Sequence, residues 1–282
     1  MTSSNSNSQS AKLYYFTGTG NTLRLTTLVK ETLENLGILT DFEPIPAMSD
    51  LEVTALKTIS ADWIGILAPV YALDIPRLMK AFLRKLPEAV RGQKAFVFIN
   101  GGDWDDVGWG VFSTCEALRN KGYDVVYGDV VMMPNNWIPM MDAPQGDVAE
   151  QIRLRGEAFV AEKTTALIGG LKYEKPVNFN NYGKIGSKLV HIGFWDLGIK
   201  RLWKHFKVTK SCTGCGYCAN HCPTKALTMV NDRPKWHKNC EQCLRCMNLC
   251  PTRSIEQLEF IGHGSKRKAY VEPHFRSTLK KE

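Results

Sequence analysis

Residues 212–224 read CTGCGYCANHCPT, and residues 240–252 read CEQCLRCMNLCPT. Both are copies of one pattern, C-x2-C-x2-C-x3-C-P-T, and the second copy begins 28 residues after the start of the first. Eight of the nine cysteines of the chain fall in these two copies. A repeat of this kind predicts two equivalent loops related by a pseudo-twofold axis.

The cysteine spacing predicts two [4Fe-4S] clusters. Three thiolates spaced two residues apart can hold three corners of one cubane, and the fourth cysteine lies too far along the chain to close it, so it reaches the other cluster. The first expected set is Cys212, Cys215, Cys218 and Cys250, and the second is Cys240, Cys243, Cys246 and Cys222. A pair of four-thiolate zinc sites is the alternative, but zinc sites rarely use three cysteines in a row at this spacing.

From Val208 to Leu258 the chain resembles the bacterial two-cluster ferredoxins over their whole length, in VTKSCTGCGYCANHCPTKALTMV and KWHKNCEQCLRCMNLCPTRSIEQL. This resemblance implies a small α+β domain that carries electrons. The ninth cysteine, Cys115, lies in an expected helix and is interpreted as a core residue.

The sequence before the cysteine motifs alternates strand-like and helical segments, which is typical of an α/β fold with a parallel sheet. The expected strands are 12–17, 40–44, 62–68, 94–100 and 124–132, and the expected helices are 21–36, 76–86, 111–121 and 147–171. Five short strands with helices on both faces predict a doubly wound sheet. Its ligands bind beyond the carboxyl ends of the strands.

Three loops follow expected strands at that edge. The loop after the first strand reads TGTGNT, and its small hydroxyls, backbone N–H groups and following helix N-terminus suit one phosphate. The other two loops contain aromatic residues that a flat ring could stack on. The alternative is that one or more of Tyr71, Trp104 and Trp109 only covers the sheet.

YYFTGTGNT at residues 14–22 resembles the flavodoxin phosphate loop, and the order of strands and loops is similar to flavodoxins over residues 12–170. The resemblance implies FMN, with its phosphate at the first loop and its ring between the other two. The implied phosphate-site residues are Thr17, Gly18, Thr19, Gly20, Asn21 and Thr22. The implied ring-site residues are Pro69, Val70, Tyr71, Ala72, Asn100, Gly101, Gly102, Asp103 and Trp104. With PVYALDIPR, MPNNWI and the cysteine motifs, the whole chain resembles the flavodoxin-ferredoxin fusion proteins of anaerobic bacteria and archaea.

The chain has 282 residues and a formal net charge of +8, but the charge is uneven: residues 1–170 carry −5 and the remainder +13. Two clusters with their thiolates and one FMN phosphate bring the total down to roughly +2, so nucleic-acid binding is not expected.

We expect a disordered stretch at 1–10, an FMN domain at 11–171, a basic aromatic connector at 172–207, a ferredoxin domain at 208–260 and a basic tail at 261–282. The tail could attract an acidic partner, or it could have no role.

The polar N-terminus and the lack of a long apolar run predict a cytoplasmic protein without a transmembrane segment. The stretch 182–207 is expected to be helical and to pack between the domains, with a membrane-surface helix as the less favoured alternative.

The expected function is electron transfer between the clusters and FMN, linking one-electron and two-electron redox partner proteins. An FMN-dependent reductase of a small organic substrate is the alternative. No paired catalytic acid and base supports it, and no catalytic residue is assigned.

Overall fold

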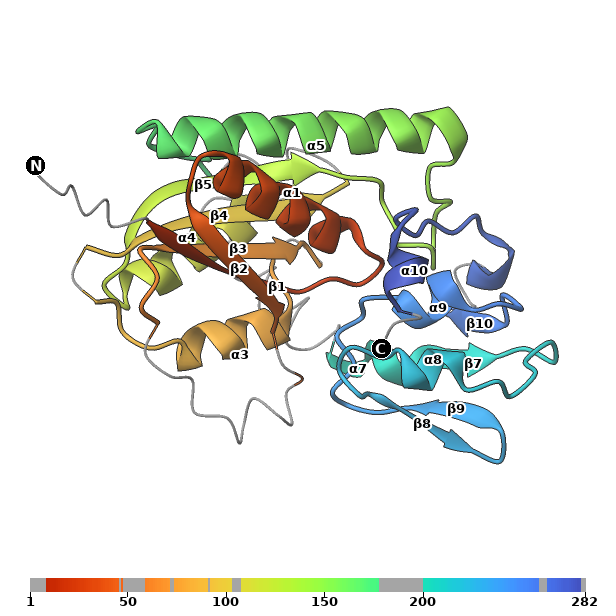
Figure 1. Ribbon diagram of the computed structural model, residues 1–282. Helices are drawn as coiled ribbons and strands as arrows, with labels where there is room; N and C mark the ends of the chain where they lie inside the picture. Colours follow the sequence, from red (N-terminus) through yellow and green to blue (C-terminus); the bar gives the residue numbers. More distant parts are fainter. Residues whose placement is uncertain are drawn as a thin grey trace, which may run out of the picture.

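The computed structural model describes residues 9–45, 47, 59–71, 74–90, 92–102, 108–177, 200–258 and 263–279. It shows an α/β domain followed by a smaller C-terminal region, which we define as the described residues from 200 to 279 (Figure 1). The C-terminal region lies against the carboxyl-terminal edge of the sheet. This is the edge where the sequence predicts ligand-binding loops.

The α/β domain is built on a six-stranded parallel sheet with the order β2-β1-β3-β4-β5-β6. The strands are β1 (Ser10–Tyr15), β2 (Leu39–Pro44), β3 (Trp63–Pro69), β4 (Lys94–Gly101), β5 (Asp124–Met132) and β6 (Tyr173–Glu174). Every residue of β3 is buried, as expected for a central parallel strand that is covered on both faces. The order of the first five strands is the flavodoxin-like order, and its switch point lies between β1 and β3.

Two pairs of helices cover the two faces of the sheet (Figure 1). They are α1 (Asn21–Asn35), α3 (Arg77–Lys85), α4 (Gly108–Arg119) and α5 (Gly146–Ile168). Phe82 of α3 and Leu118 of α4 share one core cluster, whereas Leu25 of α1 and Val160 of α5 share the other. The sheet therefore has a complete apolar core on each face, and its carboxyl edge is left to the loops.

The doubly wound α/β architecture predicted from the sequence is confirmed, with two corrections. The sheet has a sixth strand, β6, whose two residues are too few to give a periodic signal and which pairs with Tyr127 and Gly128 of β5. Trp109, expected on a loop, lies in the first turn of α4 and packs against Phe112 with ring centroids 5.5 Å apart. It is therefore part of a helix face.

The C-terminal region contains two small antiparallel sheets and several short helices. The sheets pair β7 (Phe206–Val208) with β10 (Ile255–Gln257), and β8 (Leu227–Val230) with β9 (Arg233–Trp236). The helical segments are α7 (Lys200–Leu202), η2 (Trp203–His205), α8 (Tyr217–Asn220), α9 (Arg245–Leu249), η3 (Gly264–Lys266) and α10 (Phe275–Thr278). Phe206 stacks on Trp236 at 4.9 Å between ring centroids, so β7 lies beside β9.

Two segments differ from the sequence expectations. Phe206 and Lys207, expected at the end of a connector helix, form part of strand β7 because their backbone pairs with β10. The rest of that expected helix, up to residue 199, lies outside the described residues.

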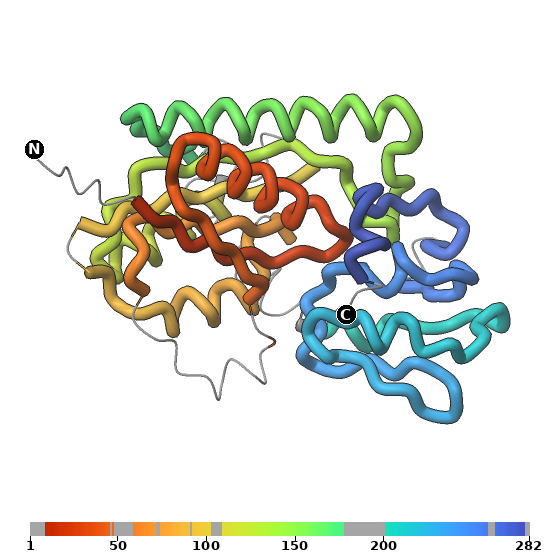
Figure 2. Tube along the Cα trace, viewed as in Figure 1, coloured from red at the N-terminus to blue at the C-terminus, as the bar shows by residue number. Residues whose placement is uncertain are grey.

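The described part of the basic tail packs against the loop between β1 and α1, and Phe275 is 3% exposed (Figure 2). No helix in the described part of the chain has the length and apolarity needed to cross a membrane.

Candidate cofactor sites at the domain junction

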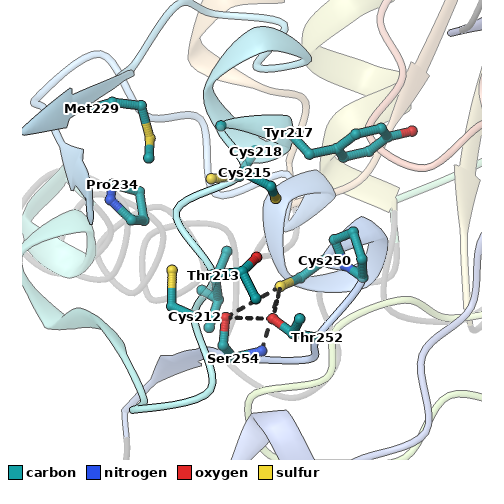
Figure 3. A pocket seen from close by; sticks show the side chains of 13 residues that line it. Cys212, Thr213, Cys215, Tyr217, Cys218, Met229, Pro234, Cys250, Thr252 and Ser254 are labelled. Atoms are coloured by element: carbon teal, nitrogen blue, oxygen red, sulfur yellow. Dashed lines mark hydrogen bonds between the residues drawn. The ribbon is translucent and has the colours of Figure 1, made fainter. Parts of the chain in front are cut away.

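The first expected cysteine set surrounds a cavity. Cys212, Cys215, Cys218 and Cys250 all line it, together with Met229 and Pro234 of the β8–β9 hairpin (Figure 3). The fourth cysteine of this expected set, Cys250, belongs to the other motif and lines the same cavity. The cavity is small and walled by sulfur and apolar atoms, which suits an iron-sulfur cubane.

The second expected set is more deeply placed. Cys222 interacts electrostatically with each of Cys240, Cys243 and Cys246, so the four thiols lie together. Burial raises the pKa of Cys243 to about 11 and raises those of Cys240 and Cys246 as well. Burial thus disfavours the free thiolates, and a metal centre bound here would supply the positive charge that stabilises them.

The two cysteine loops share an unusual backbone conformation. In the first motif, Gly214 and Gly216 have positive φ angles of 73° and 72°. At the equivalent positions of the second motif, Gln242 and Leu244 have φ angles of 57° and 55°, although neither is glycine. A left-handed conformation costs a bulky residue on the order of 1 kcal/mol or more, so it persists only where the surroundings require it. The two motifs thus share one loop conformation, whichever residue type occupies these positions.

Hydrogen bonds to sulfur also repeat. The N–H of Ala226 donates to Cys222 Sγ at 3.2 Å, and the N–H of Ser254 donates to Cys250 Sγ at 3.4 Å. Hydrogen bonds from Ser254 and Thr252 outweigh the effect of burial and lower the pKa of Cys250. Such bonds stabilise a coordinating thiolate and influence the reduction potential of a cluster.

The TGTGNT loop follows β1 at the switch point of the sheet. Thr19 and Thr22 are each 1% exposed, and Gly20, with φ of 106°, directs the chain into the first turn of α1. The N–H of Gly20 donates to Thr17 Oγ1 at 3.1 Å, which closes the loop. Hydroxyl groups and the N–H groups of a helix start are therefore concentrated at one buried point.

The C-terminal region encloses this loop. Arg245 donates hydrogen bonds to the carbonyl oxygens of Gly18 at 2.7 Å and Thr17 at 2.8 Å. A Cβ atom at Gly18 would lie 2.7 Å from the carbonyl oxygen of Cys243 and 2.7 Å from the hydroxyl oxygen of Tyr71. The loop thus touches a cysteine of the second set directly, and only glycine allows this approach.

The residues around the loop fit a phosphate-bearing group in their donors. The Tyr71 hydroxyl is buried, has no hydrogen-bond partner among the described residues and can donate to a phosphate, whereas the unpartnered Asn21 Oδ1 is an acceptor and cannot. The opposing feature is Glu272, which is 3% exposed and packs at Gly20, with its Cβ 2.7 Å from the position of an added glycine Cβ. Burial raises the pKa of Glu272 and favours its neutral form, which limits repulsion of an anion.

The two loops expected to flank a flavin ring are described in part. Pro69, Asn100 and Gly101 are buried at the carboxyl edge of the sheet, Val70 and Tyr71 are half-buried, and Gly102 is exposed. Asn100 Oδ1 accepts a hydrogen bond from the Thr22 hydroxyl at 2.6 Å, so the first and third loops meet. Ala72, Asp103 and Trp104 lie outside the described residues.

Sequence reasoning missed the residues that join the two parts. Glu241, in the second motif, accepts a hydrogen bond from the N–H of Leu78 at 3.2 Å and pairs with Arg77 at 3.2 Å, so it caps α3 from the other part of the chain. Asn248 donates to the carbonyl oxygen of Asn136 at 3.0 Å. A signal was present: the second motif places Glu241 and Arg245 between its cysteines, where the first has Thr213 and Tyr217.

Comparisons with known proteins agree with this geometry. Residues 211–254 match the family model of the 4Fe-4S dicluster domain. No curated protein matches the chain.

Solved structures similar to this chain include the two-electron reduced flavodoxin of Megasphaera elsdenii, with 18% identity over 54% of this chain and 98% of that one (TM-score 0.35). An NAD(P)H:quinone oxidoreductase from Methanothermobacter marburgensis has 12% identity over 57% of this chain and 99% of that one (TM-score 0.40). Rubredoxin oxygen:oxidoreductase from Desulfovibrio gigas has 14% identity over 57% of this chain, which spans only 37% of that protein (TM-score 0.34).

The strand order and the family match lead to one conclusion about the architecture. The order β2-β1-β3-β4-β5 defines the N-terminal fold, and the matched cysteine region defines the C-terminal one. The chain is a fusion of a flavodoxin-like α/β domain and a ferredoxin-like 4Fe-4S dicluster domain.

Proposed function

We propose that the protein transfers electrons between two [4Fe-4S] clusters and an FMN bound at the Thr17–Thr22 loop. The ligands would be Cys212, Cys215, Cys218 and Cys250 for the first cluster, and Cys240, Cys243, Cys246 and Cys222 for the second. FMN exchanges one or two electrons and each cluster exchanges one, so the protein would link one-electron and two-electron redox partners.

The observation that carries this proposal is the contact between the loop and the second cysteine set. Gly18 touches Cys243, and Arg245 binds the carbonyl oxygens of both Thr17 and Gly18. Both sites therefore belong to one packed junction, and electrons can pass between them without domain movement. The loop holds the phosphate end, and the buried threonines and the enclosing C-terminal segment exclude water from it.

The first test is the cofactor content of protein purified without oxygen. We expect about eight iron atoms per chain, from two four-iron clusters, and one FMN. Replacing Cys243→Ser is expected to remove about half of the iron, whereas the control Cys115→Ala is expected to retain all of it, because Cys115 is buried in the core of the other domain. Zinc in place of iron contradicts the proposal.

The loop and the transfer step need their own measurements. Thr19→Ala is expected to lower the flavin content, whereas Thr26→Ala, which replaces a buried threonine in the second turn of α1, is the matched control. Cluster reduction followed by optical reduction of FMN within a single turnover supports the proposal. Reduced flavin that is reoxidised only when a small organic substrate is added supports the alternative, a reductase. Protein that holds both clusters and no flavin contradicts the FMN part.

A further inference from the structure

The two cysteine sets differ in their access to solvent. Cys215 of the first set is exposed, and Cys212, Cys218 and Cys250 are partly buried, whereas in the second set Cys240 and Cys243 are buried and Cys222 and Cys246 are partly buried. Cys243 of the second set packs in a core cluster of the flavodoxin-like domain, whereas the first set lines a cavity beside the β8–β9 hairpin (Figure 3). An external electron carrier can therefore approach the first set more closely than the second.

Three exposed cations lie on segments next to this set. Lys210 lies two residues before Cys212, and Arg233 donates a hydrogen bond to the carbonyl oxygen of Cys212 at 2.8 Å. Lys235 lies on β9 next to Pro234, whose side chain lines the cysteine cavity. Because neighbouring residues of a strand point to opposite faces, Lys235 projects away from that cavity and is exposed. We call Lys210, Arg233 and Lys235 the basic face.

Few acidic side chains offset the basic face. Within the described residues 200–258 the other exposed cations are Arg201, Lys204, Lys207, Lys225 and Lys238. Asp232 is the one exposed acidic residue described in that span. The span has a formal charge of +8 from its side chains, and two clusters with their thiolates would leave it at about +4. Residues 1–170, by contrast, carry −5, so the dicluster domain is the end that attracts an anion.

We propose that the basic face is the docking surface for an acidic one-electron carrier protein, which exchanges electrons with the cluster of the first cysteine set. This inference rests on the proposed function, because it requires that cluster. The carrier, a reduced acidic iron-sulfur protein, loses one electron and the cluster gains one, with no bond formed or broken. Positive charge near an exposed redox centre steers such a carrier and orients it on contact.

An acidic protein fits this surface better than a nucleic acid or a membrane does. Duplex DNA or an anionic lipid surface would gain nothing from the exposure of Cys215. A redox carrier needs that exposure, because its own centre must come close to the cluster. The placement of the charges around a redox site therefore favours the protein.

The test is the rate at which a small acidic [2Fe-2S] ferredoxin, reduced in advance, passes electrons to the holoprotein in a stopped-flow instrument without oxygen. In the double variant Lys210→Glu/Lys235→Glu we expect the second-order rate constant to fall about tenfold or more at low salt. The difference should largely disappear at about 0.5 M salt, because exposed charges are then screened. The matched control is Arg84→Glu/Lys172→Glu, which makes the same charge change on exposed residues of the flavodoxin-like domain.

Reduction by photoreduced 5-deazaflavin separates failure of the docking inference from failure of the proposed function. Deazaflavin is small and should reduce the clusters of all three proteins at equal rates. If it reduces no cluster even in the unmodified protein, the proposed function fails. If it reduces all of them and the Lys210→Glu/Lys235→Glu variant still reacts with ferredoxin as fast as the unmodified protein, only the docking inference is overturned. Tighter binding to a short DNA duplex or to anionic vesicles than to the ferredoxin also overturns it.

Discussion

Replacement of Arg245 by methionine should loosen the nucleotide loop from the dicluster domain. The guanidinium group donates to three carbonyl oxygens, those of Gly18 at 2.7 Å, Thr17 at 2.8 Å and His221 at 3.0 Å. It also lies over the ring of Phe275, 5.0 Å from its centroid. Hydrogen bonds from a charged donor contribute about 1.5–3 kcal/mol each and are not additive. We therefore expect Arg245→Met to lower the free energy of opening at this junction by roughly 3 kcal/mol.

Hydrogen exchange over the TGTGNT loop and the first turn of α1 measures this effect. A loss of roughly 3 kcal/mol corresponds to exchange about a hundredfold faster in that segment, with little change in β3 and β4. Arg245→Lys should give an intermediate result, because an ammonium group keeps the charge but lacks the planar fork. The control is Arg233→Met, since Arg233 is exposed and donates a hydrogen bond to the carbonyl oxygen of Cys212, in the first motif. If Arg245→Met retains its iron and the loop exchanges within about threefold of the unmodified rate, the reasoning is wrong.

Three further replacements test the same junction. Glu241→Ala should destabilise the protein by about 1–3 kcal/mol in chemical denaturation, because it leaves Arg77 without its buried carboxylate and the N–H of Leu78 without an acceptor; an unchanged midpoint contradicts the capping role. Gly18→Ala should lower both flavin content and thermal stability, since the added Cβ would meet Cys243 and Tyr71 at 2.7 Å. Because burial raises the pKa of Glu272 above its ordinary value of 4.5, its contribution to stability is present at low pH and is lost as pH rises through the raised value. Glu272→Gln should therefore raise the thermal midpoint more at about pH 8 than at about pH 5, and an equal shift at both values argues against a buried carboxylate.

The α/β fold was predictable because its signals are local. Apolar runs such as the one in β3, followed by helical patterns, reflect burial on both faces of a parallel sheet. The cysteine sets remain a prediction, and it rests on a related reason: ligand spacing restricts which thiols can share a centre. The contribution of Cys250 to the cavity of the first motif agrees with that restriction.

The junction could not be predicted from local patterns. Contacts such as Arg245 with Gly18, or Glu241 with Leu78, join residues far apart in the sequence, and no periodicity relates them. The C-terminal segment was also difficult to interpret. Phe275 is a single aromatic residue between charged and polar neighbours, so its burial against the loop leaves no amphipathic pattern. Strand β6 was missed because two residues carry no alternation.

The divergence of the two cysteine motifs connects these findings to electron flow. Both motifs need left-handed backbone at the same two positions, and the first motif meets this need with Gly214 and Gly216. The second uses Gln242 and Leu244, which cost more locally but bury side chains at 8% and 3% exposure. In the same motif, Glu241 and Arg245 hold the flavodoxin-like domain, whereas the first motif stays at the surface among cations. The two motifs therefore differ in position: the second contacts the flavodoxin-like domain and the first is more exposed. This difference sets the order of the proposed electron path, which runs from the carrier to the first cluster, then to the second cluster and then to the flavin.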